Sequence, residues 1–439
     1  MNRIEGPSLV PSIPPSSPPV QLPRANVYRF TLRHMFLGVA FLLLLFAVVV
    51  PNSLPLSTAG AMGLAFMLAL PGIRLGQSLR NLLALYACTV IVTIVYVIVG
   101  GMHGAPLVAM AEVTAVYIVS PMVWMIIAEG LHRRLGVDGL IDWFILLSVL
   151  CVLSVALFFY LFLTRGASAV EFFFQGANVN LSEGFSGATM HVYGSMIFLC
   201  GGFFSTPELI KSKPLRFGLL VMLLICALTS GRSALILAIP IGWILGWMLA
   251  SRTVEHVGKS AIARLIQYGL PLLIAVMATL FLLQAYTQVS VSSVFDIVFD
   301  KVASGGGSAR AEMSRSLYEG IFDNGGLGAG HGVGVQFVSD PLHPWRYEVV
   351  WLATIYRVGI VGAVIYVLPF LLYAVGVIRL ALARLLPVRH KFMFCGFVCA
   401  FLATNTNPYI EAFSLQWMYV IPLVLWYIEY PSILKRVSQ

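Results

Sequence analysis

Residues 141–163 read IDWFILLSVLCVLSVALFFYLFL, an apolar run in which Asp142 is the one charged side chain. A helix needs about 20 such residues to cross the hydrocarbon core of a bilayer, so this stretch predicts a transmembrane helix. Similar runs recur along the chain. The predicted spans lie near 35–50, 56–71, 82–100, 107–128, 141–163, 190–204, 216–229, 233–250, 266–284, 348–378, 392–404 and 415–430.

The composition agrees with a membrane protein. Of the 439 residues, 59% are hydrophobic and 10% are charged, and the mean hydropathy is +0.91. Soluble domains carry about 25% charged residues, so a soluble globular core is excluded. We therefore expect an all-α fold: a polytopic membrane helix bundle with about 12 transmembrane helices, counted as one integral membrane domain over 35–430.

The basic residues predict the orientation of the chain. The net charge of +9 would suggest a nucleic-acid partner in a soluble protein, but here Lys and Arg flank the cytoplasmic ends of helices. If the number of spans is even and both termini are cytoplasmic, most of the 27 Lys and Arg lie on the cytoplasmic side. The expected location is the bacterial inner membrane, with no nucleic-acid partner.

Three segments lie outside the predicted spans. Residues 1–34 are rich in proline, which predicts a disordered cytoplasmic tail, and the absence of a small-residue cleavage site after 35–50 predicts an uncleaved anchor. Residues 431–439 form a predicted cytoplasmic C-terminal tail. Residues 285–347 form a long periplasmic loop between the ninth and tenth spans.

A few basic residues lie outside the predicted cytoplasmic segments, so the positive-inside rule does not explain them and another explanation is needed. They are Arg165, Arg232, Lys301, Arg310, Arg315, Arg346 and Arg357. Arg357 falls inside the tenth span, where an arginine is costly and is a functional hypothesis by default. The alternative is a structural ion pair with Glu112 or Glu348. Arginine forks bind phosphate bidentately without changing protonation, so this set suits an anionic substrate.

The sequence His343-Pro344-Trp345-Arg346 is expected to open the tenth helix. Proline suits the first helical position, which leaves His343 near the N-cap. There the helix dipole favours an anion and keeps the imidazole neutral as a proton acceptor. In one helix, Arg346 and Arg357 would share a face. The alternative for His343 is an ordinary N-cap.

Two glycine-rich stretches, 304–312 and 323–332, lie in the long loop. Glycine backbone can approach a phosphate or sugar closely. Neither stretch has the strand–loop–helix context or the GxxxxGK[ST] pattern of a nucleotide site. Ordinary turns therefore remain the alternative.

Taken together, residues 217–430 resemble the O-antigen polymerase and O-antigen ligase superfamily of bacterial integral membrane proteins. The segments that carry the resemblance are, in chain order, Thr229-Ser230-Gly231-Arg232-Ser233-Ala234, Arg310-Ala311-Glu312, Asp323-Asn324, Gly328-Ala329-Gly330, His343, Arg357-Val358-Gly359-Ile360-Val361-Gly362 and Thr406-Asn407-Pro408-Tyr409. The chain departs from the pattern at Gly325-Gly326, which replaces a proline-containing pair, and at Pro344, where asparagine is commoner.

The resemblance implies a metal-independent glycosyltransferase without a cofactor. Its donor would be a glycan on undecaprenyl pyrophosphate, and its acceptor a glycan hydroxyl at the periplasmic face of the bilayer. The implied catalytic residues are His343, Arg310 and Arg232, with Glu348, Asp340 and Glu411 as other candidates for the base. The implied substrate-binding residues are Arg357, Arg346, Arg315, Glu348, Asn407 and Tyr409.

Several functions remain open within and beyond this class. A polymerase joins lipid-linked oligosaccharide repeats of O-antigen, capsule or exopolysaccharide, and could work with a protein that regulates chain length. A ligase instead transfers the glycan to lipid A core. The segment 406–409 resembles repeat-unit polymerases and favours the first. A lipid-linked sugar flippase or secondary transporter is the alternative from another class, although transporters usually show internal repeats.

Overall fold

The structure is a computed structural model of the 439-residue chain. It describes residues 24–74, 76–166, 168–170, 178–182, 185–189, 191–230, 232–250, 307–338, 340, 341 and 343–435. The predicted ninth span at 266–284, the proline-rich residues 1–23 and the first glycine-rich residues, 304–306, lie outside this set.

The first helices follow the predicted spans closely. They are α1 (Arg24–Leu44), which continues into a π-helical turn (Leu45–Val49), α2 (Pro55–Ala69), α3 (Gln77–Met102) and α4 (Leu107–Thr114). Pro55 and Pro106 stand at or next to helix starts, where a missing N–H costs nothing. Because α1 begins at Arg24, residues 24–34 are helical, which corrects the predicted tail boundary.

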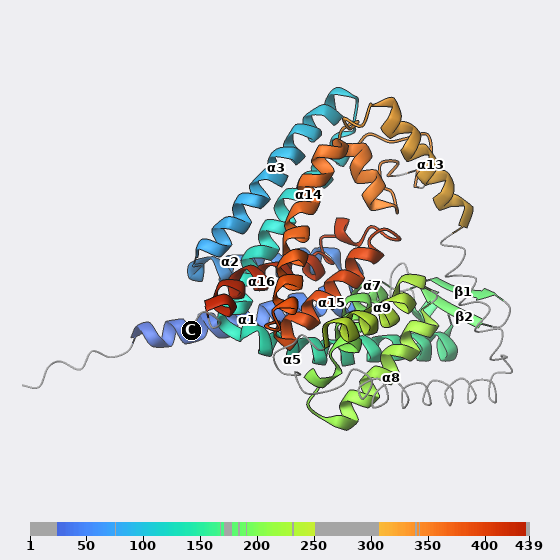
Figure 1. The fold of residues 1–439 in the computed structure, drawn as a ribbon. Coiled ribbons are helices and arrows are strands. Elements are labelled where there is room, and N and C mark those ends of the chain that lie inside the picture. Colours follow the sequence, from blue (N-terminus) through green and yellow to red (C-terminus); the bar gives the residue numbers. More distant parts are fainter. Residues whose placement is uncertain are drawn as a thin grey trace, which may run out of the picture.

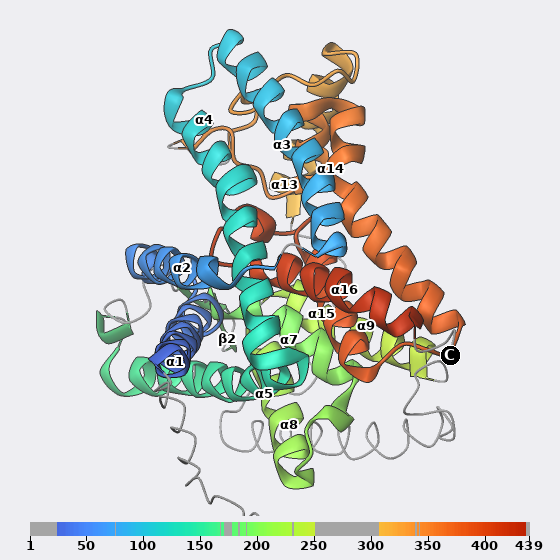
Figure 2. The same ribbon diagram turned by 90° about the vertical axis from the view of Figure 1, so that its left-hand side faces the viewer.

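The fourth and fifth predicted spans form one helical segment. A π-helical turn (Ala115–Val119) joins α4 to α5 (Ser120–Arg165). Gly136 inside α5 has φ +76°, a conformation that only glycine adopts easily, and α5 changes direction there (Figure 2). The short connection predicted between these two spans is therefore a glycine kink.

The segment after α5 contains the one departure from an all-α fold among the described residues. Strands β1 (Asn178–Ser182) and β2 (Phe185–Thr189) pair as an antiparallel hairpin, in which Asn178 faces Thr189. Apart from this short hairpin, the described elements are helices, in agreement with the predicted all-α fold. The hairpin falls in a polar connection that was too long for a tight turn.

The remaining helices are α7 (Val192–Ser205), α8 (Lys213–Thr229), α9 (Ser233–Ala250), α13 (Gly307–Asp323), α14 (Val350–Leu382), α15 (Val388–Ala403) and α16 (Trp417–Lys435). Ser212 caps α8 by accepting a hydrogen bond from the backbone N–H of Leu215. Helix α14 kinks at Gly359, where φ is +68°. The end of α16 at Lys435 places the first residues of the predicted C-terminal tail in a helix.

Six helical segments among the described residues are long and apolar enough to cross a membrane: Leu32–Val49, Pro55–Gly72, Gln77–Met102, Leu107–Phe162, Val350–Leu382 and Trp417–Lys435. The predicted count of about 12 spans is therefore not confirmed. Helices α7 and α9 are shorter than a bilayer is thick. The apolar helices define a helical, membrane-embedded protein.

The helices divide into two regions around α16. Helices α3 and α14 run side by side and α13 packs against α14 (Figure 1). In the other region, α7 lies between α9 and α15 and is buried along its whole length. Aromatic side chains fill the interior next to α7; Phe198, for example, lies 5.0 Å from Trp417 between ring centroids.

Close packing of α7 against α9 depends on small residues. A Cβ atom added to Gly242 would lie 2.5 Å from the carbonyl oxygen of Gly201, so the two backbones are in contact. We expect Gly242→Ala to destabilise the protein by about 1–3 kcal/mol through overpacking. Thermal unfolding in detergent measures this effect. The control is Gly218→Ala, because a Cβ there has nothing within 4 Å; equal melting temperatures in the two variants would contradict the expectation.

Candidate functional site

The loop between α15 and α16, residues 404–411, contacts three of the predicted arginines. Each arginine comes from a different part of the chain, and each binds a different residue of the loop: Arg232 contacts Tyr409, Arg310 contacts Thr406, and Arg357 contacts Glu411. We call residues 404–411 with these three arginines the arginine site.

Arg232 lies in the short connection from α8 to α9. Its backbone N–H donates to the hydroxyl of Ser230 (3.1 Å), and its Nη1 donates to the hydroxyl of Tyr409 (3.2 Å). Its Nε is buried and has no hydrogen-bond partner among the described residues. Burial raises the pKa of Tyr409, so its phenol stays protonated and carries no negative charge that would pair with Arg232. A buried N–H without an acceptor is costly, which favours an anion beside Arg232.

Arg310 lies in the first turn of α13. Its Nε donates to a carboxylate oxygen of Glu348 (2.7 Å), and its Nη2 donates to the backbone carbonyl of Thr406 (2.8 Å). Met313 and Leu317 on α13 pack into a small apolar cluster with α14. This packing fixes α13 so that Arg310 faces the loop.

Arg357 forms the most buried ion pair of the site. Its side chain is 4% exposed and pairs with Glu411, which is 14% exposed. Its Nη2 also donates to the carbonyl of Trp345 (2.7 Å), and Tyr117 donates to the same carboxylate (2.7 Å). The partner is thus neither Glu112 nor Glu348, the two carboxylates that the sequence suggested. Loop 404–411 supplies it, from a residue that belongs to no predicted span.

The second glycine-rich stretch, 323–332, packs against protein backbone. Gly330 donates to the carbonyl of Arg357 (2.9 Å), and Ile360 donates to the carbonyl of Gly326 (3.1 Å). A Cβ on Gly359 would lie 2.6 Å from the carbonyl oxygen of Leu327. These glycines therefore let the loop approach α14 at its kink, next to Arg357, and hold the kink in place.

The segment that contains His343 is a turn and not the start of a helix. Arg346 N–H donates to the carbonyl of His343 (3.0 Å), and α14 begins at Val350. Pro344 is thus not a first helical residue, and Arg346 and Arg357 do not share a helix face. Contacts with other elements hold the turn: Arg346 forms an ion pair with Glu112, and Trp345 donates to the same carboxylate (3.3 Å).

The other predicted residues have different surroundings. His343 Nδ1 lies 2.8 Å from a carboxylate oxygen of Asp340, and its ring packs edge-on against Trp345. Asn407 is half-buried in the loop, and its carbonyl accepts from the backbone of Tyr409 (2.7 Å). Arg315 is 82% exposed and pairs with Glu319 along α13. It contacts no residue of loop 404–411 among the described hydrogen bonds and ion pairs, so it is not part of the arginine site, and its predicted substrate-binding role stays a prediction.

Two histidines near the site were missed by the sequence analysis. His191 precedes α7, and burial together with nearby Arg232 lowers its pKa. His331 is buried at the end of the glycine-rich stretch, where Nε2 lies 3.1 Å from the hydroxyl of Tyr366. His191 follows the segment 165–189, which was predicted to lie on the same side of the membrane as Arg232. That position could have marked His191 as a candidate site residue.

A pH dependence of stability follows from His331. Burial, with a smaller contribution from Arg357, lowers its pKa from 6.5 to about 3. The unfolded chain therefore binds a proton first as pH falls, and stability present above pH 6.5 decreases toward pH 3. At pH 5 the expected loss is about 2 kcal/mol. Thermal unfolding at pH 7.5 and pH 5 should show a smaller loss for His331→Asn than for wild type; equal losses would contradict this origin.

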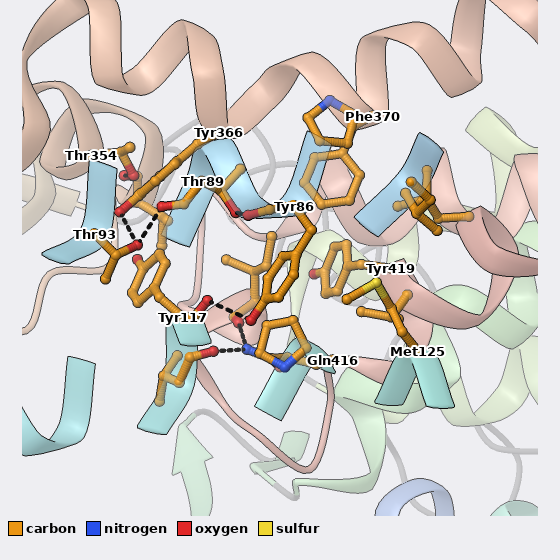
Figure 3. A pocket seen from close by; sticks show the side chains of 18 of the residues that line it. Tyr86, Thr89, Thr93, Tyr117, Met125, Thr354, Tyr366, Phe370, Gln416 and Tyr419 are labelled. Carbon is orange, nitrogen blue, oxygen red and sulfur yellow. Dashed lines mark hydrogen bonds between the residues drawn. The ribbon is translucent and has the colours of Figure 1, made fainter. Parts of the chain in front are cut away.

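An apolar cavity of about 120 Å³ lies beside the arginine site, between α3, α5, α14 and α16. Figure 3 shows aromatic rings around it, including Tyr86, Phe370 and Tyr419. The hydroxyls of its threonines donate mostly to backbone carbonyls of their own helices, as Thr354 does to Val350 (2.8 Å), so the lining is mainly hydrocarbon. Tyr117 belongs to the wall and also donates to Glu411, which joins the cavity to the arginine site.

Among the residues that the structure describes, no group of three or more His, Cys, Asp or Glu side chains could hold a metal ion. No protein-family model matches the sequence, and no curated protein matches it. Its function must therefore be argued from the arginine site and the adjoining cavity.

Proposed function

We propose that the protein is a membrane glycosyltransferase that polymerises undecaprenyl-pyrophosphate-linked oligosaccharide repeats at the periplasmic face of the inner membrane. The observation that carries this proposal is the convergence of Arg232, Arg310 and Arg357 on loop 404–411. Guanidinium groups recognise phosphate through paired N–H donors and cannot lose their charge. Three of them on one loop suit a pyrophosphate.

The transfer step needs a stabilised leaving group and a base. The acceptor hydroxyl attacks the anomeric carbon, its proton passes to the base, and the bond from that carbon to the pyrophosphate oxygen breaks with its electrons on the oxygen. Arg232 has an unused buried donor and binds the negative charge that develops there. Arg310 forms an ion pair with Glu348, and Arg357 forms one with Glu411. The pyrophosphate therefore replaces these carboxylates as the partner of the two arginines when it binds.

His343 is the proposed base. Asp340 accepts from its Nδ1, which orients the ring and leaves Nε2 to take the acceptor proton. His191 is the second candidate, because its position beside Arg232 and its lowered pKa keep it neutral. Replacing His343 and His191 one at a time shows which of the two acts as the base.

The cavity suits the lipid part of the donor. Its mainly hydrocarbon lining favours an apolar chain, and Tyr117 links it to the ion pair of Arg357 and Glu411. The part of a polyprenyl chain nearest its pyrophosphate would lie in the cavity, with the pyrophosphate at the arginines. The combination of an apolar pocket and an adjoining basic loop favours a lipid-linked donor over a water-soluble one.

Glycan profiling tests this function. A deletion strain is rescued with wild type, Arg232→Gln, His343→Ala, His191→Ala or the exposed control Arg315→Gln, and both surface and lipid-linked saccharides are analysed. Single repeats in the Arg232→Gln strain, with full chains in the control, support a polymerase. Long chains that stay on undecaprenyl pyrophosphate would identify a ligase. Full rescue by every variant would overturn the enzymatic assignment and favour a transporter.

A further inference from the structure

A second cluster of arginines lies where α1, α2 and α5 meet, on elements separate from the arginine site. Arg33 on α1 donates to the backbone carbonyl of Arg134 on α5 (2.9 Å). Arg134 donates to the carbonyl of Leu68 (3.1 Å), and its guanidinium lies 4.1 Å from the ring centroid of Phe36. These contacts hold two cationic side chains at one end of the three helices.

The guanidinium groups of Arg133 and Arg134 converge over Gly72, which ends the turn after α2. A Cβ atom on Gly72 would lie 3.1 Å from Nη2 of Arg134 and 3.4 Å from Nη1 of Arg133. Glycine therefore leaves the space that both arginines occupy. Two like charges held this close repel each other unless an anion lies between or above them.

Nearby acidic groups do not balance this charge. Glu129 is the one carboxylate that contacts the cluster among the described residues; its Oε1 lies 3.6 Å from Arg133 and accepts from the backbone of Arg74 (3.4 Å). Within the described part of the chain, its Oε2 has no hydrogen-bond partner, and neither has the buried Nη1 of Arg134. Three arginines thus face one carboxylate, and one arginine donor is unused. An anionic group is the missing partner.

The surroundings indicate that this anion carries hydrocarbon chains. Leu64, Met67 and Leu70 follow one another at helical spacing along α2 and the turn after it, and all three are exposed, as is Met35 on α1. They belong to helical segments that are long enough to span a membrane, so they face lipid tails. The apolar row ends at the arginine cluster, as a phospholipid tail ends at its phosphate.

We propose that Arg33, Arg133 and Arg134, around Gly72, bind the phosphate of an anionic phospholipid whose acyl chains lie along Leu64, Met67 and Leu70. Basic pockets between transmembrane helices are known to take such head groups. The site shares no residue with the arginine site, so it stands whether or not the proposed function is correct. The lipid joins α1, α2 and α5 and stabilises their packing.

The test measures thermal unfolding of the full-length protein in neutral detergent. Dioleoyl phosphatidylglycerol, dioleoyl phosphatidylcholine or inorganic phosphate is added to wild type, to Arg33→Gln/Arg133→Gln, and to the control Arg80→Gln/Arg315→Gln. The control removes the same charge at two exposed arginines outside the cluster. Phosphatidylglycerol should raise the melting temperature of wild type and control by several degrees. The cluster variant should lose at least half of that shift.

Three results would overturn the proposal. Equal protection by phosphatidylcholine, whose choline cation balances its phosphate, would mean that the net negative charge of the lipid is not recognised. Equal protection by inorganic phosphate would mean a site for a soluble anion. An unchanged shift in the cluster variant would place the lipid elsewhere. If the double variant does not fold, Arg133→Gln alone removes one side chain that is partly exposed, and native mass spectrometry of that variant should show fewer retained phosphatidylglycerol molecules than wild type.

Discussion

Arg357→Met is expected to destabilise the folded protein by about 3–5 kcal/mol, because it leaves Glu411 buried without its cationic partner. Glu411 is 14% exposed, and its remaining side-chain donor is Tyr117. The carbonyl of Trp345 also loses a donor. Unfolding of the purified protein in detergent measures the loss. Tyr117→Phe, which removes one hydrogen bond and no charge, should cost about 1 kcal/mol and serves as the control.

The double variant Arg357→Met/Glu411→Leu separates the structural role of Arg357 from its role in transfer. Replacing both members of a buried ion pair with apolar residues is often nearly neutral, so most of the lost stability should return. Glycan transfer should stay absent, because no guanidinium remains for the pyrophosphate. A double variant that folds and transfers glycan at the wild-type rate would show that Arg357 serves only the fold.

The sequence singled out the three arginines as candidates, but it could not predict which residues they contact. Arg232, Arg310 and Arg357 were each identified because a cation in an external or apolar segment needs a reason. Their partners lie far along the chain: Tyr409 is 177 residues from Arg232, and Thr406 is 96 residues from Arg310. Periodicity predicts that helices form, but not which loop lies between them.

Local signals also failed where long-range contacts decide the conformation. Pro344 is a good first helical residue, yet the chain from His343 to Val349 stays in turns and extended backbone. The backbone N–H of Val335 donates to the hydroxyl of Tyr347 (2.7 Å), and the Trp345 carbonyl accepts from Arg357. The contact from Arg357 satisfies a carbonyl that would otherwise bond within a helix, and both contacts hold the segment in its observed path. A helix start at His343 would break both of them.

Glycine was identified correctly as a sign of close approach, but its partner was different. The sequence suggested a phosphate or a sugar beside the stretch 323–332, whereas Gly330 approaches protein backbone: a Cβ there would lie 2.3 Å from the backbone nitrogen of Gly100. The predicted count of about 12 spans was not confirmed, for a related reason. Helix α7 is apolar because it is buried within the protein, and hydropathy does not distinguish a protein interior from lipid.

Arg232→Gln is expected to lower the rate of glycan transfer by about 10²–10³-fold, the usual effect of removing one donor to a developing oxyanion. Its effect on stability should be small, because the folded state loses a hydrogen bond to the neutral hydroxyl of Tyr409 and no ion pair. The assay uses purified protein with a repeat unit on undecaprenyl pyrophosphate and follows the release of the lipid pyrophosphate.

Two further variants identify the property of Arg232 that matters. Arg232→Lys keeps the charge but loses the planar fork, so it should recover only part of the rate. Tyr409→Phe removes the acceptor of Arg232 Nη1 without touching its charge, and should cost less than Arg232→Gln because the guanidinium remains beside the loop. Arg315→Gln is the matched control, since its side chain is 82% exposed. If Arg232→Gln and Arg315→Gln transfer glycan equally fast, the buried donor of Arg232 does not bind the leaving group, and the pyrophosphate must be held by other residues.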